Sequence, residues 1–109
     1  ETHIHFYSKC IYVERYWTDI KNWAINDHNA EYKTKDRLYG TADQHPYSID
    51  NTLLREARST LWKCRLIKTI PKISFLKSRL IKQIPTLILT QKDQQIIQSL
   101  KKLHKMAEN

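Results

Sequence analysis

Residues 51–69, Asn-Thr-Leu-Leu-Arg-Glu-Ala-Arg-Ser-Thr-Leu-Trp-Lys-Cys-Arg-Leu-Ile-Lys-Thr, form a helical pattern with two distinct faces. At about 100° per residue, four small or apolar side chains fall within about 80° of one another, which predicts the buried face of a helix. They are Leu54, Ala57, Leu61 and Cys64. Asp50 is placed to cap the first turn, and Pro71 to end the helix. We therefore expect a long helix here that buries Cys64 as a core thiol.

The neighbouring face of this helix is cationic and has an aromatic ring in its middle. It consists of Arg55, Arg58, Trp62 and Arg65, which fall within another arc of about 80°. Guanidinium groups bind phosphate through paired hydrogen bonds, and a Trp among them can stack on an unpaired base. This face is therefore the candidate nucleic-acid-binding site. The alternative is that Trp62 covers a neighbouring loop while the arginines are only solvated.

Helical spacing continues on both sides of this stretch. Residues 11–25 carry an apolar and aromatic stripe made of Val13, Tyr16, Trp17, Ile20, Trp23 and Ala24. A second stripe follows Ser74 as N-cap, is broken by Pro85, and consists of Phe75, Leu76, Leu80, Ile81 and Ile84. A last helix should start at the capping-box pattern of residues 90–93 and bury Ile96, Ile97, Leu100, Leu103 and Met106.

The composition is typical of a small helical protein. The chain has 109 residues, enough for one small domain, and its one Gly and three Pro argue against a β-sandwich or barrel with many tight turns. Residues 26–50 are polar and turn-prone and show no clear periodicity, which indicates a loop or linker. We therefore predict an all-α fold, a small bundle of about four helices with a long polar loop in the first half.

Positive charge is concentrated in the second half of the chain. Residues 1–54 hold six Lys or Arg and eight Asp or Glu, whereas residues 55–109 hold thirteen and three. The second half therefore accounts for the formal net charge of +8 at pH 7. Such asymmetry suits contact with a polyanion, and RNA or DNA is the commonest one inside cells. The alternative is a solvated basic surface without a partner.

His5 and Cys10 are two potential zinc ligands near the start of the chain. An imidazole nitrogen and a thiolate supply half of the four ligands that a tetrahedral structural site needs. The only other cysteine is Cys64, so the chain holds no closely spaced Cys pair for the other half. On these residues alone, a two-ligand remnant or an ordinary buried thiol is the alternative. Two cysteines in different helical patterns form no disulfide framework, which favours a reducing, intracellular setting.

The motif around these two ligands resembles the C-terminal region of the reverse transcriptase polyprotein of LINE-type, non-LTR retrotransposons. The matching residues are Glu1-Thr2, His5, Phe6-Tyr7, Cys10 and Tyr16-Trp17, followed by Leu53-Leu54, Ala57, Leu61 to Arg65, Pro71, Ser74 and Phe75. In the family, a Cys pair precedes Glu-Thr-x-x-His, two apolar residues and Cys, and a Trp-Lys-Cys-like helix end comes later. This chain lacks the Cys pair, and Ile11 stands where the family often has Pro.

The resemblance implies a zinc-binding turn at His5 and Cys10 that is held in place by the helix of residues 11–25. It implies contact with template RNA or target DNA, and with the upstream polymerase portion of the same polyprotein, in the nucleus or in a cytoplasmic ribonucleoprotein. The aspartates that hold the two metal ions of such a polymerase belong to a part of the polyprotein that is not in this chain. We therefore expect no catalysis by this segment alone.

These observations divide the chain into three parts. Residues 1–25 form a half zinc-knuckle turn plus an aromatic helix, 26–50 a loop or linker, and 51–109 a basic helical region. The chain opens on Glu1 within a recognisable motif, which favours a fragment. It contains no apolar run of about 18 residues, the length that would indicate a membrane span. Two other interpretations are open: a decayed element fragment without activity, and a basic helical protein-interaction module.

Overall fold

All regular secondary structure in the described parts of the chain is helical. The computed structural model describes residues 11–28, 34–41 and 44–108. Its helices are α1 (Ile11–His28), α2 (Thr34–Tyr39), α3 (Ile49–Leu66), α4 (Ile73–Leu89) and α5 (Gln94–Ala107). The predicted all-α class is confirmed. The expected number of about four helices omitted α2, which has only six residues.

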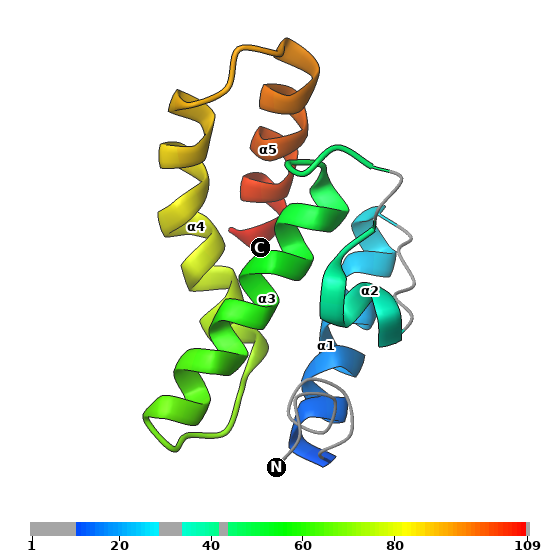
Figure 1. Ribbon diagram of the computed structural model, residues 1–109, viewed down its shortest axis with the longest axis vertical. Helices are drawn as coiled ribbons and strands as arrows, with labels where there is room; N and C mark the ends of the chain where they lie inside the picture. Colours follow the sequence, from blue (N-terminus) through cyan, green and yellow to red (C-terminus); the bar gives the residue numbers. More distant parts are fainter. Residues whose placement is uncertain (1–10, 29–33, 42–43, 109) are drawn as a thin grey trace.

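The long helix α3 lies in the middle of the molecule (Figure 1). On one side of it, α4 and α5 run up and down beside one another. Residues 67–72 connect α3 to α4, and residues 90–93 connect α4 to α5. On the other side lie α1 and α2. The helix that carries the candidate site is therefore packed on several sides, and only part of its surface is exposed to solvent.

The hydrophobic core lies where α1, α3, α4 and α5 meet. α1 buries the predicted residues Val13, Tyr16, Trp17, Ile20 and Ala24, whereas Trp23 is only partly buried. α3 buries Leu54, Ala57, Leu61 and Cys64, as predicted. α5 buries Ile96, Leu100, Leu103 and Met106, whereas the predicted Ile97 is only partly buried, and it exposes Lys101, Lys102 and Lys105. The predicted helix faces are thus confirmed on three of the four core helices.

α4 differs from its prediction in length and in its buried face. It begins at Ile73 with Lys72 as N-cap, rather than after Ser74, and it continues past Pro85 to Leu89. The predicted break at Pro85 is wrong. A proline removes one backbone hydrogen bond, but Ile84 beside it is fully buried, so packing holds the helix together across this position.

Two residues of the predicted α4 stripe lie on its surface. Phe75 and Ile81 are 41% and 40% exposed, whereas Leu76, Leu80 and Ile84 are completely buried. The buried stripe is narrower than predicted because the partners of α4 lie on one side of it. Phe75 is consequently available at the surface beside α3.

The starts of α3 and α5 lie at other residues than predicted. Ser48 caps α3, and its hydroxyl oxygen accepts a hydrogen bond from the amide of Asn51. Asp50, the predicted cap, lies inside the first turn instead. Asp93 caps α5 by accepting from the amide of Gln95 at 2.9 Å, so the helix starts after the predicted capping box rather than within it.

The segment predicted as a loop or linker, residues 26–50, is bound to the helices where it is described. It contains α2, whose Arg37 lies over the ring of Trp17 at 5.4 Å and pairs with Glu14 of α1 at 3.3 Å. A polar stretch without periodicity is therefore held by side-chain contacts rather than by an apolar stripe.

Asn51 of α3 binds the backbone that follows α2. Its Oδ1 accepts the amide hydrogen of Thr41 at 2.6 Å, and its Nδ2 donates to the carbonyl of His45 at 3.0 Å. Gly40 has a φ of +79°, and a Cβ at this position would lie 2.8 Å from Asn51 Oδ1. The only glycine of the chain therefore stands where both backbone conformation and space require it.

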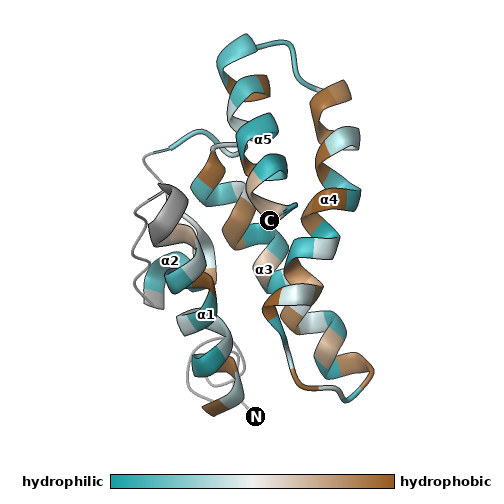
Figure 2. Ribbon diagram, turned by 180° about the vertical axis from the view of Figure 1, so that it is seen from behind, coloured by the Kyte–Doolittle hydropathy of each residue, from teal (hydrophilic) through white to brown (hydrophobic). Residues whose placement is uncertain are grey.

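α3 ends in a backbone motif that closes its last turn. The amide of Thr69 donates to the carbonyl of Cys64 at 2.9 Å, and the amide of Lys68 donates to that of Arg65 at 3.2 Å. These are the two hydrogen bonds of a Schellman motif, and Lys68 occupies its left-handed position with a φ of 55°. The hydrophobic connection that follows is visible in Figure 2, with Ile67 and Ile70 exposed.

Candidate nucleic-acid interface

Trp62 is the aromatic centre of the predicted cationic face, and it is accessible. Its side chain is 47% exposed, and the Arg65 guanidinium lies 5.9 Å from the centre of its ring. An indole buried beneath a loop would be largely covered, so the exposed fraction favours an available stacking surface. The guanidinium lies over the ring, so it adds a positive charge beside the exposed part of the indole.

Arg55 and Arg58 have structural contacts as well as exposure. Arg55 Nη1 donates to the carbonyl of Pro46 at 3.3 Å, and its guanidinium lies 4.8 Å from the centre of the Tyr47 ring. Arg58 Nη1 donates to the carbonyl of Arg37 in α2 at 3.4 Å. Both arginines are therefore held in place by the segment before α3, which fixes the direction of their charges.

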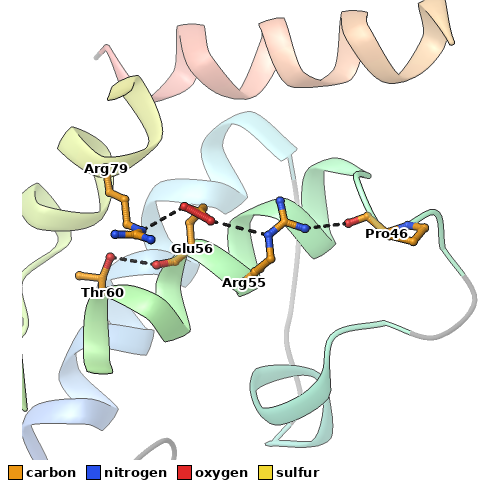
Figure 3. Close-up of polar contacts among 5 residues, drawn as sticks. All are labelled: Pro46, Arg55, Glu56, Thr60 and Arg79. Atoms are coloured by element: carbon orange, nitrogen blue, oxygen red, sulfur yellow. Dashed lines mark hydrogen bonds and ion pairs between the residues drawn. The ribbon is translucent and has the colours of Figure 1, made fainter. Parts of the chain in front are cut away.

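Glu56 lies between two arginines at this interface and is only 6% exposed (Figure 3). Its Oε1 accepts from Arg79 Nε of α4 at 3.0 Å, and its Oε2 lies 3.7 Å from Arg55 Nε. Thr60 donates to the backbone carbonyl of Glu56 at 2.9 Å. A buried carboxylate needs paired positive charge, and these two arginines provide it.

These side chains surround one hollow of about 400 Å³ between α3 and α4, which we call the Trp62 hollow. Its walls are Arg55, Arg58, Ser59, Trp62, Lys63 and Arg79. The structure thus brings together three of the four predicted residues, while Arg65 lies against Trp62 outside the wall. Four cationic side chains and one indole thus line the hollow, and the Glu56 carboxylate that pairs with Arg55 and Arg79 is buried.

Lys63 and Arg79 belong to this interface but were not predicted. Arg79 comes from α4, and no periodicity within residues 51–69 could reveal it. A signal did exist in the sequence, since residues 57–92 contain nine Lys or Arg and no Asp or Glu. This acid-free stretch covers the second half of α3 and all of α4, the two helices that form the hollow.

The predicted zinc ligands His5 and Cys10 lie outside the described residues, so the zinc site stays a prediction. Across residues 11–28, 34–41 and 44–108, no three His, Cys, Asp or Glu side chains come together as a metal site. None of the helices in these ranges is both long enough and apolar enough to cross a membrane.

The comparisons with known proteins returned no match: no protein-family model, no curated protein and no solved structure resembles this chain closely enough to indicate a relative.

Proposed function

We propose that this chain binds single-stranded RNA or DNA across α3 and α4, as a non-catalytic C-terminal segment of a retrotransposon reverse transcriptase. The observation that carries the binding proposal is the Trp62 hollow, which is lined by four cationic side chains and by an indole that is 47% exposed. The retrotransposon origin rests on the sequence resemblance around His5 and Cys10 and along α3.

The chemistry of the hollow favours a single strand over a duplex. Every base has a π-face that can stack on Trp62, but only an unpaired base can present that face to a side chain. Arg58, Lys63 and Arg79 can then bind the flanking phosphates, and the absence of acidic residues from residues 57–92 lowers the repulsion of the backbone. Such contacts give affinity with little sequence preference.

The first test is the salt dependence of binding to a fluorescently labelled single-stranded oligonucleotide. The double variant Arg58→Gln with Lys63→Gln removes two cations from the hollow. It should weaken binding and reduce the slope of log K against log salt by about 1.4, from about 0.7 for each lost phosphate contact on a single strand. The matched control is Lys101→Gln with Lys102→Gln, which removes the same charge from the exposed face of α5.

The second test concerns stacking. Trp62→Leu keeps an apolar side chain but removes the indole, and affinity for the single strand should fall by about 5- to 150-fold, the equivalent of about 1–3 kcal/mol for one stacked base. Circular dichroism establishes that the variant keeps its helices. The proposal of a defined interface would be overturned if the α3 double variant and the α5 control lost affinity equally and Trp62→Leu left affinity unchanged.

The zinc part of the proposal has its own measurement. Zinc titration followed by circular dichroism should change the signal of the wild type, and His5→Ala or Cys10→Ser should abolish the change. No response to zinc in a chain that keeps its helices would remove zinc from the proposal and leave the nucleic-acid interface standing. An unfolded chain with or without zinc would favour a decayed element fragment.

A basic protein-interaction module is the second candidate function, and one observation favours it. The connection after α3 exposes apolar side chains, including Leu66 at 63%, Ile67 at 72% and Ile70 at 51%. Exposed apolar clusters are common at protein interfaces. Competition decides between the two functions, because heparin or RNA should displace a partner from the Trp62 hollow but not from this apolar connection.

A further inference from the structure

A second hollow opens beside the first between α3 and α4, and we call it the Phe75 hollow. It has a volume of about 300 Å³ and is lined by Thr60, Lys63, Cys64, Ile67, Phe75, Ser78, Arg79, Lys82 and Gln83. This volume lies at the lower end of the roughly 300–1,000 Å³ of small-molecule sites. It therefore suits a single ring system rather than an extended cofactor.

The two hollows share a wall. Lys63 of α3 and Arg79 of α4 line both, so the Trp62 hollow lies on one side of this pair of cations and the Phe75 hollow on the other. The Glu56 contact uses the hydrogen on Arg79 Nε. A guanidinium has four more hydrogens on its two terminal nitrogens. These N–H groups could donate hydrogen bonds to a phosphate oxygen that lies between the two hollows.

We infer that the Phe75 hollow receives an unpaired nucleobase, the neighbour of the base stacked on Trp62, with the connecting phosphate held between Lys63 and Arg79. This inference rests on the proposed function and deepens it, because it gives the site a length of at least two nucleotides. It also adds Phe75, Lys82 and Gln83 to the residues that contact the strand.

The lining of the Phe75 hollow fits a base in three respects. The Phe75 ring is 41% exposed and offers an aromatic face for stacking, with Lys72 Nζ 6.0 Å from its centre. The Gln83 amide and the Ser78 hydroxyl carry donors and acceptors for the edge of a base. Lys82 adds a cation at the rim for the next phosphate.

The floor of the hollow is compatible with a negatively charged strand. Cys64 is 4% exposed, and burial raises the pKa of its thiol above the usual value. The thiol therefore stays neutral at physiological pH and does not repel the phosphates. It also provides a reporter, because a base in the hollow would cover its sulfur from a thiol reagent.

The experiment compares two probes, tetrathymidylate and an abasic tetranucleotide with the same number of phosphates. Phe75→Ala should lower the affinity of the full chain for tetrathymidylate by about 5-fold or more, the lower end of the stacking range, and leave its affinity for the abasic probe unchanged. The matched control is Ile81→Ala. This residue lies on the same helix with almost the same exposure, 40%, but does not line the hollow, so affinity for both probes should be unchanged.

The second readout is the rate at which Cys64 reacts with a thiol reagent in a Cys10→Ser background. Tetrathymidylate should slow this reaction and the abasic probe should not. The second base site is overturned if Phe75→Ala binds tetrathymidylate as the wild type does and the probe does not protect Cys64. The base site at Trp62 still stands in that case if Trp62→Leu lowers the affinity for the single strand. If neither probe binds the wild type, the proposed function itself fails.

Discussion

Glu56 of α3 and Arg79 of α4 lie 23 positions apart and meet in an ion pair of 3.0 Å between Oε1 and Nε. Glu56 is almost completely buried, so this pair both fastens α4 to α3 and fixes the direction of a guanidinium that lines two hollows. The same contact therefore belongs to the stability of the fold and to the geometry of the proposed interface.

Replacing the buried carboxylate tests the structural half of this relationship. Glu56→Gln keeps the size of the side chain but leaves the Arg79 guanidinium, 20% exposed, without its counter-charge. The free energy of unfolding should fall by about 2–3 kcal/mol, somewhat less than the roughly 3–5 kcal/mol for one partner of a fully buried pair. Urea unfolding measures it. The control Glu14→Gln breaks a pair with Arg37 in which Glu14 is 49% exposed, and it should cost less than about 1 kcal/mol.

Asn51 should be equally important for the segment that leads into α3. Asn51→Ala removes the acceptor of the Thr41 amide and the donor to the Thr41 carbonyl, so partly buried backbone groups lose their partners. A loss of about 1–3 kcal/mol is expected in urea unfolding. Asn51→Asp keeps the acceptor and loses only the Nδ2 donor, and its stability should lie between those of the wild type and Asn51→Ala. An unaffected Asn51→Ala would contradict a structural role for this network.

Lys68 offers a route to a more stable protein. Its φ of 55° lies in the left-handed region, where a Cβ is unfavourable and glycine is not. Lys68→Gly should raise the thermal midpoint and stabilise the fold by up to about 1 kcal/mol. Lys68→Ala removes the same charge and keeps the Cβ, so it should give no such gain. Equal midpoints for the two variants would mean that the backbone conformation is not what limits stability here.

Tyr16 should make the fold sensitive to alkaline pH. Its hydroxyl donates to the carbonyl of Ala57 at 3.1 Å, and burial raises the pKa of the phenol far above its usual value near 10. The unfolded chain loses this proton near pH 10 while the folded chain keeps it, so the stabilisation is complete below that pH and is lost progressively above it.

Tyr16→Phe separates this effect from other alkaline titrations. The variant should be less stable at neutral pH by about 1 kcal/mol, the value of a buried hydrogen bond, but its stability should decline less between about pH 9 and 11.5. Chemical unfolding at a series of pH values measures both. Tyr12→Phe alters a tyrosine that is 53% exposed, and its pH profile should follow that of the wild type. Parallel profiles for all three proteins would refute the assignment to Tyr16.

The helix faces could be predicted because their signal is local. Leu54, Ala57, Leu61 and Cys64 repeat with the period of a helix, and the structure buries all four. Pro85 and Phe75 could not be placed correctly in the same way. Whether a proline ends a helix, and whether an aromatic residue lies inside, depends on the partners that surround α4, and these come from other parts of the chain.

The lining of the Trp62 hollow was predictable only on the side that α3 contributes. Trp62, Arg55 and Arg58 follow from helical spacing, but Lys63 lies outside the predicted arc and reaches the hollow on its long side chain. Arg79 required knowledge that α4 folds back along α3, and the burial of Glu56 required knowledge that its partner Arg79 comes from that helix. Pairings between helices carry no periodic signal in a single sequence.

The acid-free stretch of residues 57–92 also has a consequence for the chain without any ligand. Nine positive side chains on two adjacent helices and their connections repel one another, and folding brings them closer together than they are in the unfolded chain. Added salt screens this repulsion, so moderate salt should raise the thermal midpoint of the free protein, whereas it should weaken the proposed binding to a nucleic-acid strand. Dissolved ions should therefore stabilise the free fold and, under the proposed function, compete with the strand for the same charges.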